Sequence, residues 1–191
     1  MRETALAARV DPTSIAPLLA VRNLEAWYGE SHVLHGIDFE VASGEVVTLL
    51  GRNGAGKTTT LKSIIGILPK RRGSVVFDGA ETIRLPSRAI ARLGVGYVPE
   101  ERGIFASLSV EENLILPPQV KPGGLSLEQI GRTIARLKKE GFTIVLVEQN
   151  FRFASTVADR HYVVEQGRII DMIPNADLEN NVDKLHAYLG V

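Results

Sequence analysis

The residues with the most specific chemistry in this chain form one short stretch, GRNGAGKT, at positions 51–58. Its three glycines let the backbone turn tightly enough to aim several N–H groups at one point, and a helix that begins near Lys57 adds its positive N-terminal end. Lys57 supplies a point charge for phosphate oxygens, and the Thr58 hydroxyl is a suitable ligand for Mg²⁺. The spacing therefore predicts a cradle for a polyphosphate. A glycine-rich turn with a chance lysine is the alternative.

The segments on either side of this loop have the patterns that such a cradle needs. VVTLL, at 46–50, is a continuous apolar run, typical of a strand buried on both faces of a parallel sheet. Apolar residues spaced three and four apart from Leu61 to Leu68 predict a helix that Pro69 ends. Strand, loop and helix thus follow in the order that a nucleotide-binding loop requires, which favours the cradle over the chance turn.

An antiparallel sheet is predicted ahead of the loop. Apolar and polar residues alternate between Ile37 and Val41, and glycines mark the turns on either side. The same region contains Trp27 and Tyr28, and an aromatic ring placed there can stack on a purine base. Small-molecule kinases begin with their phosphate loop close to the N-terminus, so these preceding strands argue against such a kinase, as does the absence of a lid-like arginine cluster.

The rest of the chain alternates predicted strands and helices, which is typical of an α/β domain. We expect a loose arm at 1–17, because this stretch lacks periodicity, and a single domain over 18–191. The later predicted elements are strands at 95–100 and 143–149, a helix at 130–141, a hairpin at 161–172 and a helical tail at 175–189 with Leu178, Leu185 and Leu189 buried.

Composition excludes several classes of function. Twenty-two basic and twenty-two acidic residues cancel, so no overall positive field attracts nucleic acid. The absence of cysteine excludes disulfides and cysteine-ligated zinc. No apolar run approaches the roughly 18 residues of a membrane span, and Asp11 and Pro12 interrupt the N-terminal segment before a signal-like core forms. We expect a cytosolic protein that reaches a membrane only through a partner.

Three segments resemble one family and together cover most of residues 18–173. They are LEAWYGESHVLHGIDFEVASGEVVTLLGRNGAGKTTTLKSIIGILPKRRGSVVFDG, VGYVPEERGIFASLSVEENL and TIVLVEQNFRFASTVADRHYVVEQGRII. All are similar to ATP-binding subunits of ABC transporters, and the last two to those that drive bacterial uptake of branched-chain amino acids. The resemblance implies an α/β P-loop NTPase fold with a mixed central sheet, flanking helices and an N-terminal antiparallel β-subdomain. It also implies an ATPase coupled to transport, with ATP and Mg²⁺ as cofactors.

Carried onto this chain residue by residue, the resemblance implies a nucleotide site. Tyr28 would stack on adenine; the alternative is a core tyrosine of an edge strand. The loop would contact the nucleotide through Gly51, Asn53, Gly54, Ala55, Gly56, Lys57, Thr58 and Thr59. Thr58 and Glu100 would ligate Mg²⁺; Glu100 stands where most of the family has a glutamine that contacts the metal and the attacking water. Gln149 stands where many members have a histidine that senses the γ-phosphate. Glu100 and Gln149 could also be ordinary polar loop residues.

The resemblance also implies partners and a location. Two ATPase subunits, identical or different, would enclose two ATP·Mg²⁺ head to tail, and their closure would drive separate transmembrane permease subunits. A periplasmic solute-binding protein would be an indirect partner, and nucleic acid would not be one. The chain would then lie on the cytoplasmic face of the inner (plasma) membrane as a peripheral subunit.

Two features that the family requires do not occur in the sequence: an LSGGQ-type signature and an apolar strand ending in Asp-Glu, which anchors Mg²⁺ and polarises water. PGGLSLEQIGRTIARL, at 122–137, contains LSLEQ, but Leu127 occupies the place of a required glycine. The apolar stripe from Leu127 to Leu137 instead predicts a helix capped by Ser126. A block near 125–131 that would hold much of the helical subdomain and the hydrolytic strand is therefore missing.

Two hypotheses explain the missing block. In the first, the working protein contains it and is the ATP-hydrolysing, energy-coupling subunit of an ABC importer, for branched-chain or related amino acids. In the second, the chain is contiguous and is a hydrolysis-deficient ATP-binding module. We favour the first, because we expect the missing strand to lie beside residues 46–50, where each orphaned backbone group would cost about 1–3 kcal/mol. Net stabilities are only about 5–15 kcal/mol.

Overall fold

The computed structural model describes residues 16–99 and 126–190. Most of the predicted N-terminal arm and Glu100 therefore lie outside the described residues. Within these ranges the chain forms two four-stranded sheets with helices between and beside them. None of the helices described in these ranges is long and apolar enough to cross a membrane.

The first sheet is antiparallel, as the alternation predicted. Its order is β2-β1-β4-β5, from strands β1 (Leu19–Tyr28), β2 (Ser31–Val41), β4 (Arg71–Phe77) and β5 (Ala80–Glu81). Alternate residues of β1 and β2 are buried, so one face of this sheet packs on the core and the other faces solvent.

The second sheet is mixed, in agreement with the predicted fold class. Its order is β6-β3-β7-β8, from β3 (Val46–Leu50), β6 (Ile144–Glu148), β7 (Arg160–Glu165) and β8 (Arg168–Pro174). Strand β3 pairs in parallel with both β6 and β7, whereas β8 runs antiparallel to β7. All five residues of β3 are buried, as its unbroken apolar run indicated.

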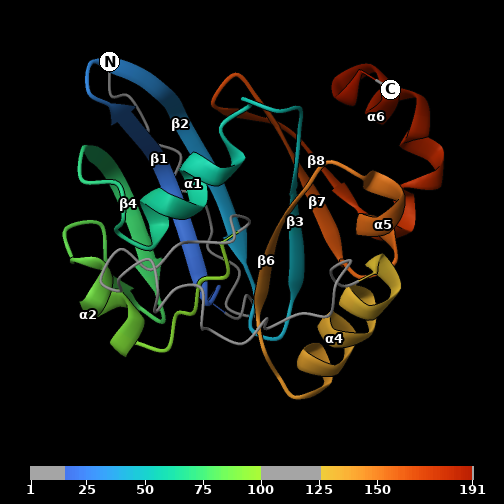
Figure 1. Ribbon diagram of the computed structural model, residues 1–191, viewed down its shortest axis with the longest axis horizontal. Coiled ribbons are helices and arrows are strands. Elements are labelled where there is room, and N and C mark those ends of the chain that lie inside the picture. The colour runs from blue at the N-terminus through green and yellow to red at the C-terminus, as the bar shows by residue number, and fades with distance from the viewer. Residues whose placement is uncertain (1–15, 100–125, 191) are drawn as a thin grey trace, which may run out of the picture.

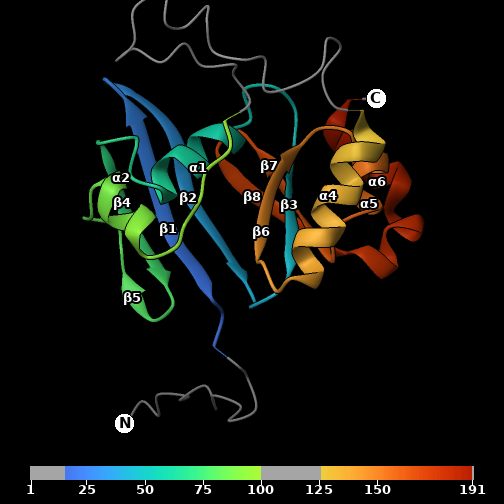
Figure 2. The same ribbon diagram turned by 60° about the horizontal axis from the view of Figure 1, so that its bottom comes forward.

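Four of the described α-helices divide between the two faces of the second sheet, and α2 lies near β4 of the first sheet (Figures 1 and 2). Helix α1 lies between the two sheets, whereas α4, α5 and α6 cover the opposite face. The bounds are α1 Lys57–Ile64, α2 Ser87–Arg92, α4 Leu127–Lys139, α5 Phe151–Ser155 and α6 Val182–Leu189, with short 3₁₀ turns at Asn175–Asp177 and Glu179–Asn181.

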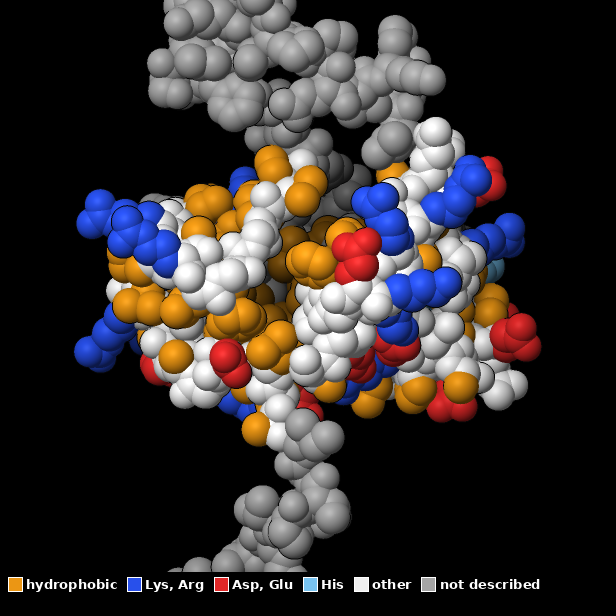
Figure 3. All heavy atoms as spheres, turned by 90° about the horizontal axis from the view of Figure 1, so that it is seen from below, with side chains coloured by type: hydrophobic (Ala, Val, Ile, Leu, Met, Phe, Trp, Pro, Cys, Tyr) orange, Lys and Arg blue, Asp and Glu red, His pale blue; other side chains and the backbone are white. Residues whose placement is uncertain are grey.

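The position that we expected for the missing strand is wrong. Both edges of β3 are occupied, by β6 on one side and β7 on the other, so no strand is absent beside Val46–Leu50. The open edge belongs to β6, which within the described ranges pairs only with β3 and whose five residues are all half-buried. Figure 3 shows hydrophobic side chains gathered along a hollow in one face of the molecule. The backbone groups that a lost strand would leave unpaired therefore belong to β6.

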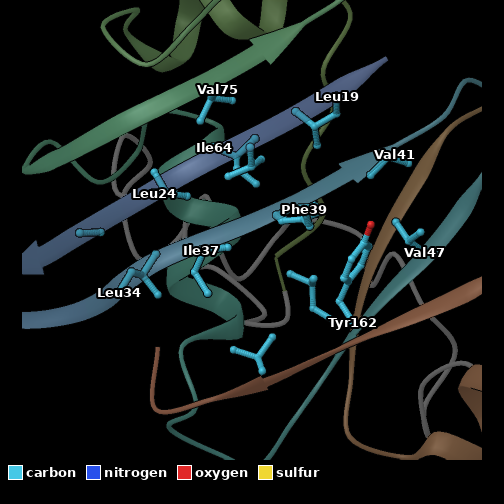
Figure 4. Packing of buried hydrophobic residues seen from close by; sticks show 14 of the residues in the cluster. Leu19, Leu24, Leu34, Ile37, Phe39, Val41, Val47, Ile64, Val75 and Tyr162 are labelled. Carbon is cyan, nitrogen blue, oxygen red and sulfur yellow. The ribbon is translucent and has the colours of Figure 1, made fainter. Parts of the chain in front are cut away.

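The side chains of β3 alternate between hydrophobic clusters on the two faces of the second sheet. Val47 and Leu49 point into a core shared with the first sheet and α1, which also contains the ring pair Phe39–Tyr162, with centroids 5.5 Å apart (Figure 4). Leu50 packs on the other side with α5 and α6, where Leu178, Leu185 and Leu189 are buried as predicted. Since β3 contributes to both cores, it fixes where the following loop emerges.

Two further predictions had opposite outcomes. The helix start at Ser126 is confirmed: Ser126 Oγ accepts from Gln129 N–H at 3.2 Å, and Gln129 Oε1 accepts from Ser126 N–H at 2.9 Å. The strand predicted at 95–100 is wrong for its described residues. Residues 95–99 have no regular secondary structure and Val98 is 92% exposed, because no strand in the described part of the chain pairs with them.

Acid should destabilise the fold through His161. This side chain is fully buried, within 2.6 Å of Thr48 Oγ1 and 2.9 Å of Asn175 Oδ1, and its burial lowers the pKa below the ordinary 6.5. The folded state thus binds fewer protons than the unfolded state, and the stability that is complete above about pH 6.5 declines as the pH falls through the lower folded pKa.

Denaturant unfolding at about pH 7.5 and about pH 5.5 tests this expectation. His161→Gln keeps a donor and an acceptor but cannot gain a proton in this range. The variant should be less stable than the unmodified protein at the higher pH, but it should lose less stability when the pH is lowered from about 7.5 to about 5.5. Equal losses of unfolding free energy in the unmodified protein and in His161→Gln would contradict the assignment of the acid effect to His161. Asp159 titrates below this window: burial raises the pKa of its carboxyl, but hydrogen bonds from Lys138 and Val46 and the charges of Lys138 and Arg160 together lower that pKa below its ordinary value.

Candidate functional site

The loop between β3 and α1 is held in a space that admits only small residues. A Cβ atom at Gly51 would lie 2.3 Å from Val164 O, and one at Gly56 would lie 2.9 Å from Leu34 Cδ2. Gly56 also has a φ of 109°, which L-residues avoid. The loop is therefore wedged between β2 and the end of β7, and the motif's first and last glycines are required by close packing.

The start of α1 offers donors to an anion. Gly56 is its N-cap and provides no side-chain cap, and the first turn contains no acidic residue. The first helical hydrogen bond runs from Thr60 N–H to Gly56 O at 2.8 Å. The N–H groups of Thr58 and Thr59 come before it and are therefore not part of the hydrogen-bond series within the helix. Together with the helix dipole, these amides form a positive end that suits phosphate.

Lys57 lies inside the loop and does not extend into solvent. Lys57 is only 8% exposed, and its Nζ donates to Gly51 O at 2.7 Å and to Arg52 O at 2.8 Å. These carbonyls offset the cost of burying the ammonium group. The arrangement places one positive charge against the inner side of the loop, beside the start of α1.

The hydroxyls at the start of α1 differ in availability. Thr60 Oγ1 donates to Gly56 O at 2.9 Å and is fully buried, whereas Thr58 is half-exposed. Thr58 therefore has the accessible hydroxyl that a Mg²⁺ ion bound to phosphate oxygens requires, and its oxygen chemistry suits that ion. Asn53 and Gly54 are exposed at the outer turn of the loop.

Tyr28 is the more accessible of the two predicted aromatic residues. It is the last residue of β1 and is 47% exposed, which excludes the alternative of a buried core tyrosine. Trp27 is covered, because its ring stacks on His32 at 4.3 Å and Arg72 lies 5.2 Å from its centroid on the ring face. Of this pair, Tyr28 is thus the residue that can stack on a base.

Gln149 is brought to the same end of the sheet as the loop. Glu148 pairs in register with Leu50, so the residues that follow each strand are neighbours, and Gln149 is exposed there. The Glu148 carboxylate is turned back on the chain and accepts from the N–H groups of Gln149 and Asn150 at 2.8 and 2.9 Å. Glu100, the other predicted accessory residue, is outside the described part of the chain.

One element of the site was missed in the sequence. The turn between β7 and β8 contacts the loop directly, since Gly167 N–H donates to Ala55 O at 2.8 Å. The Gln166-Gly167 dipeptide predicted this turn, but nothing in its spacing from the loop signalled the contact. Leu34 of β2, which packs against Gly56, was also missed, because its alternation marks it only as a core residue.

Comparison with known proteins agrees with this geometry. A family model described as ABC transporter matches residues 34–185. The high-affinity branched-chain amino acid transport ATP-binding protein BraG of Pseudomonas aeruginosa is 32% identical, over 91% of this chain and 100% of its own length. The lipopolysaccharide export system ATP-binding protein LptB of Escherichia coli K12 is 28% identical, over 90% of this chain and 97% of its own. These alignments run over 232 and 233 positions, more than the 191 residues here, so both relatives contain stretches that this chain lacks.

Solved structures share the fold. The ATP-binding subunit of an ABC transporter superposes with a TM-score of 0.67 at 22% identity, over 91% of this chain and 100% of that one. A nucleotide-free ATP-binding cassette gives a TM-score of 0.68 at 19% identity, over 92% and 99% of the two chains. At this identity the likeness concerns the fold alone.

Substitutions at two loop glycines should separate backbone strain from lack of space. Gly54 and Gly56 both have positive φ, 82° and 109°, but a Cβ atom would meet no neighbour at Gly54 and would meet Leu34 at Gly56. Gly54→Ala should cost about 1–2 kcal/mol of unfolding free energy, and Gly56→Ala roughly 1–3 kcal/mol more. Equal losses, measured by denaturant unfolding, would contradict the close packing of loop and β2.

Proposed function

Because the chain belongs to the ABC transporter family, as an ATP-binding subunit, we propose that it binds ATP with Mg²⁺ at the Gly51–Thr58 loop and couples that nucleotide to transport. The observation that carries the proposal is the Lys57 ammonium group held inside the loop, beside the uncapped start of α1. A charge and a set of amides converging on one point suit a polyphosphate better than any other common ligand.

The residues have separate roles in this proposal. Lys57 neutralises the β- and γ-phosphate oxygens, and the amides from Gly51 to Thr59, including those of Asn53 and Ala55, surround the phosphates. Thr58, with Glu100, holds Mg²⁺, which when bound offsets the charge that develops on the phosphate oxygens. Tyr28 stacks on the adenine, and Gln149, placed beside Gly51 by the β3–β6 register, contacts the γ-phosphate.

We assign the transported substrate from the relatives. The name of BraG supports transport of branched-chain amino acids, and the name of LptB supports lipopolysaccharide export. The higher identity to BraG favours the amino-acid importer. In that role the chain is a peripheral subunit on the cytoplasmic face of the inner membrane, where it pairs with a second ATPase subunit and drives permease subunits that receive cargo from a solute-binding protein.

Hydrolysis requires the block that is missing near 125–131. The length of the alignments with BraG and LptB supports a working protein that contains this block, and so does the open edge of β6. The second candidate function, an ATP-binding module without hydrolysis, is favoured by the sequence taken as contiguous, because it lacks the aspartate and glutamate of the hydrolytic strand. The transport ATPase and the binding module would differ in the mass of the protein and in ATP turnover.

Removal of the Lys57 charge tests the cradle. Lys57→Met keeps the length of the side chain and removes a charge-assisted contact worth about 1.5–3 kcal/mol, so affinity for ATP·Mg²⁺ in titration calorimetry should fall about 10- to 100-fold. Lys62→Met is the matched control, because it removes the same charge from the last turn of the same helix. Equal affinities for the two variants would exclude the loop as the phosphate site.

Intact mass and turnover decide between the two functions. The 191 residues have a mass of 20.8 kDa. A mass several kilodaltons higher, with extra peptides mapping near residues 125–131 and ATP turnover, is the expected result for the transport ATPase. A mass of 20.8 kDa with ATP bound and no phosphate release would instead identify the binding module.

A further inference from the structure

A cluster on the outer face of the first sheet has no part in the function proposed above. Trp27 stacks on His32 with an interplanar angle of 10°, and Arg72 lies over the Trp27 ring. Glu25 joins the two ends: its Oε2 accepts from Arg72 Nε and Nη2 at 3.0 and 2.7 Å and lies 3.3 Å from His32 Nε2. These four residues, here called the clamp, connect strands β1, β2 and β4.

The clamp spans an irregularity in the β1–β2 pair. Ala26 pairs with Leu34 but Trp27 pairs with His32, so Val33 is an extra residue in β2. Such a bulge interrupts the ladder of backbone hydrogen bonds and turns the strand end that follows it. The Trp27–His32 stack lies directly beyond this bulge and fixes its geometry from one side.

Tyr28 projects from the opposite face of the same strand. Successive residues of a strand alternate between faces, so Tyr28 shares the face of Leu24 and Ala26, both fully buried against the core that contains α1. Tyr28 comes two residues after Ala26, where the core ends, and is half-exposed. Within the described residues no ring contact or hydrogen bond holds its side chain, so its position depends on the backbone that the clamp fixes.

A short chain of contacts connects the bulge to the phosphate loop. Gly167 packs directly on Val33, since a Cβ at Gly167 would lie 2.0 Å from Val33 O. The same glycine donates its N–H to Ala55 O in the loop and accepts from His35 N–H at 2.9 Å. On the other side, Trp27 N–H donates to Lys70 O at 2.9 Å, shortly after the end of α1. The hairpin tip is thus anchored to both ends of the loop–helix unit.

We propose that the clamp is a positioning element for Tyr28, and that it sets the distance between the base platform and the phosphate loop, so that the site selects a nucleoside triphosphate over an inorganic polyphosphate. His32 is the specific positioning residue, because its ring both stacks on Trp27 and reaches Glu25 across the bulge. This proposal rests on the proposed ATP site. It adds a structural reason for the part of the binding free energy that the nucleotide base contributes.

The test compares ATP with inorganic tripolyphosphate, which lacks the base. Stacking of a base on an aromatic ring is worth about tenfold in affinity, so Tyr28→Ala should weaken ATP by about that factor and leave tripolyphosphate unchanged. His32→Ala should weaken ATP by a similar factor, again without effect on tripolyphosphate. His32→Phe, which keeps the stack, should restore most of the ATP affinity. The double variant Tyr28→Ala/His32→Ala should bind ATP no more weakly than Tyr28→Ala alone, because both changes remove the same base contact.

Two controls show that the clamp itself has changed. Trp27 is the only tryptophan in the chain, so its emission should change in His32→Ala and remain unchanged in Tyr28→Ala. Arg22→Ala removes an exposed ion pair with Glu40 from the same sheet, away from the tip, and should alter neither ligand's affinity.

The alternative outcomes overturn the proposal in distinguishable ways. Equal weakening of both ligands by His32→Ala would mean that the clamp supports the whole fold and not Tyr28. Loss of ATP affinity in Tyr28→Ala but not in His32→Ala would mean that Tyr28 needs no clamp. Unchanged ATP binding in Tyr28→Ala, with loss in Lys57→Met, would remove the base platform and leave the cradle. Absence of binding by either ligand to the unmodified chain would refute the ATP site itself.

Discussion

The β7–β8 turn of the second sheet contacts both strand β2 of the first sheet and the phosphate loop through backbone groups. Gly167 donates to Ala55 O, accepts from His35 N–H and packs on Val33 O, while Gly51 packs on Val164 O. Side chains at either glycine would force these backbones apart. The loop, the hairpin of the first sheet and the end of the second sheet are therefore held together by one set of backbone contacts.

Strand β3 transmits this arrangement to the rest of the domain. Its residues alternate between the core shared with α1 and the core shared with α5 and α6, and both of its edges are paired. Burial on every side leaves little freedom for the point at which the chain leaves the strand. The loop that follows is therefore rigidly placed at its origin, which is the requirement for amides and an ammonium group that must converge on a ligand.

Features that depend on neighbours in sequence were predictable, and those that depend on distant partners were not. The buried strand, the glycine loop, the following helix and the Ser126 cap all follow from local patterns. VVTLL indicated burial on both faces but not which strands flank it, and this is why the missing strand was misplaced. The local pattern does not distinguish Trp27 from Tyr28; the family resemblance selected Tyr28, and the contacts of Trp27 with His32 and Arg72 agree with that choice.

The open edge of β6 gives the missing block a physical meaning. A half-buried strand of four apolar residues, paired within the described ranges on one side only, has backbone groups and hydrophobic surface that a further strand would satisfy. The same strand ends at Glu148, which pairs with Leu50 just before the loop, so a neighbour added at this edge would end close to the proposed phosphate site. The edge that is unpaired within the described ranges is thus also the place from which, in the proposed function, residues for hydrolysis would reach the nucleotide. In the proposed function, nucleotide binding rests on β3, the loop and the first sheet, and hydrolysis rests on the edge of β6, which is unpaired within the described ranges.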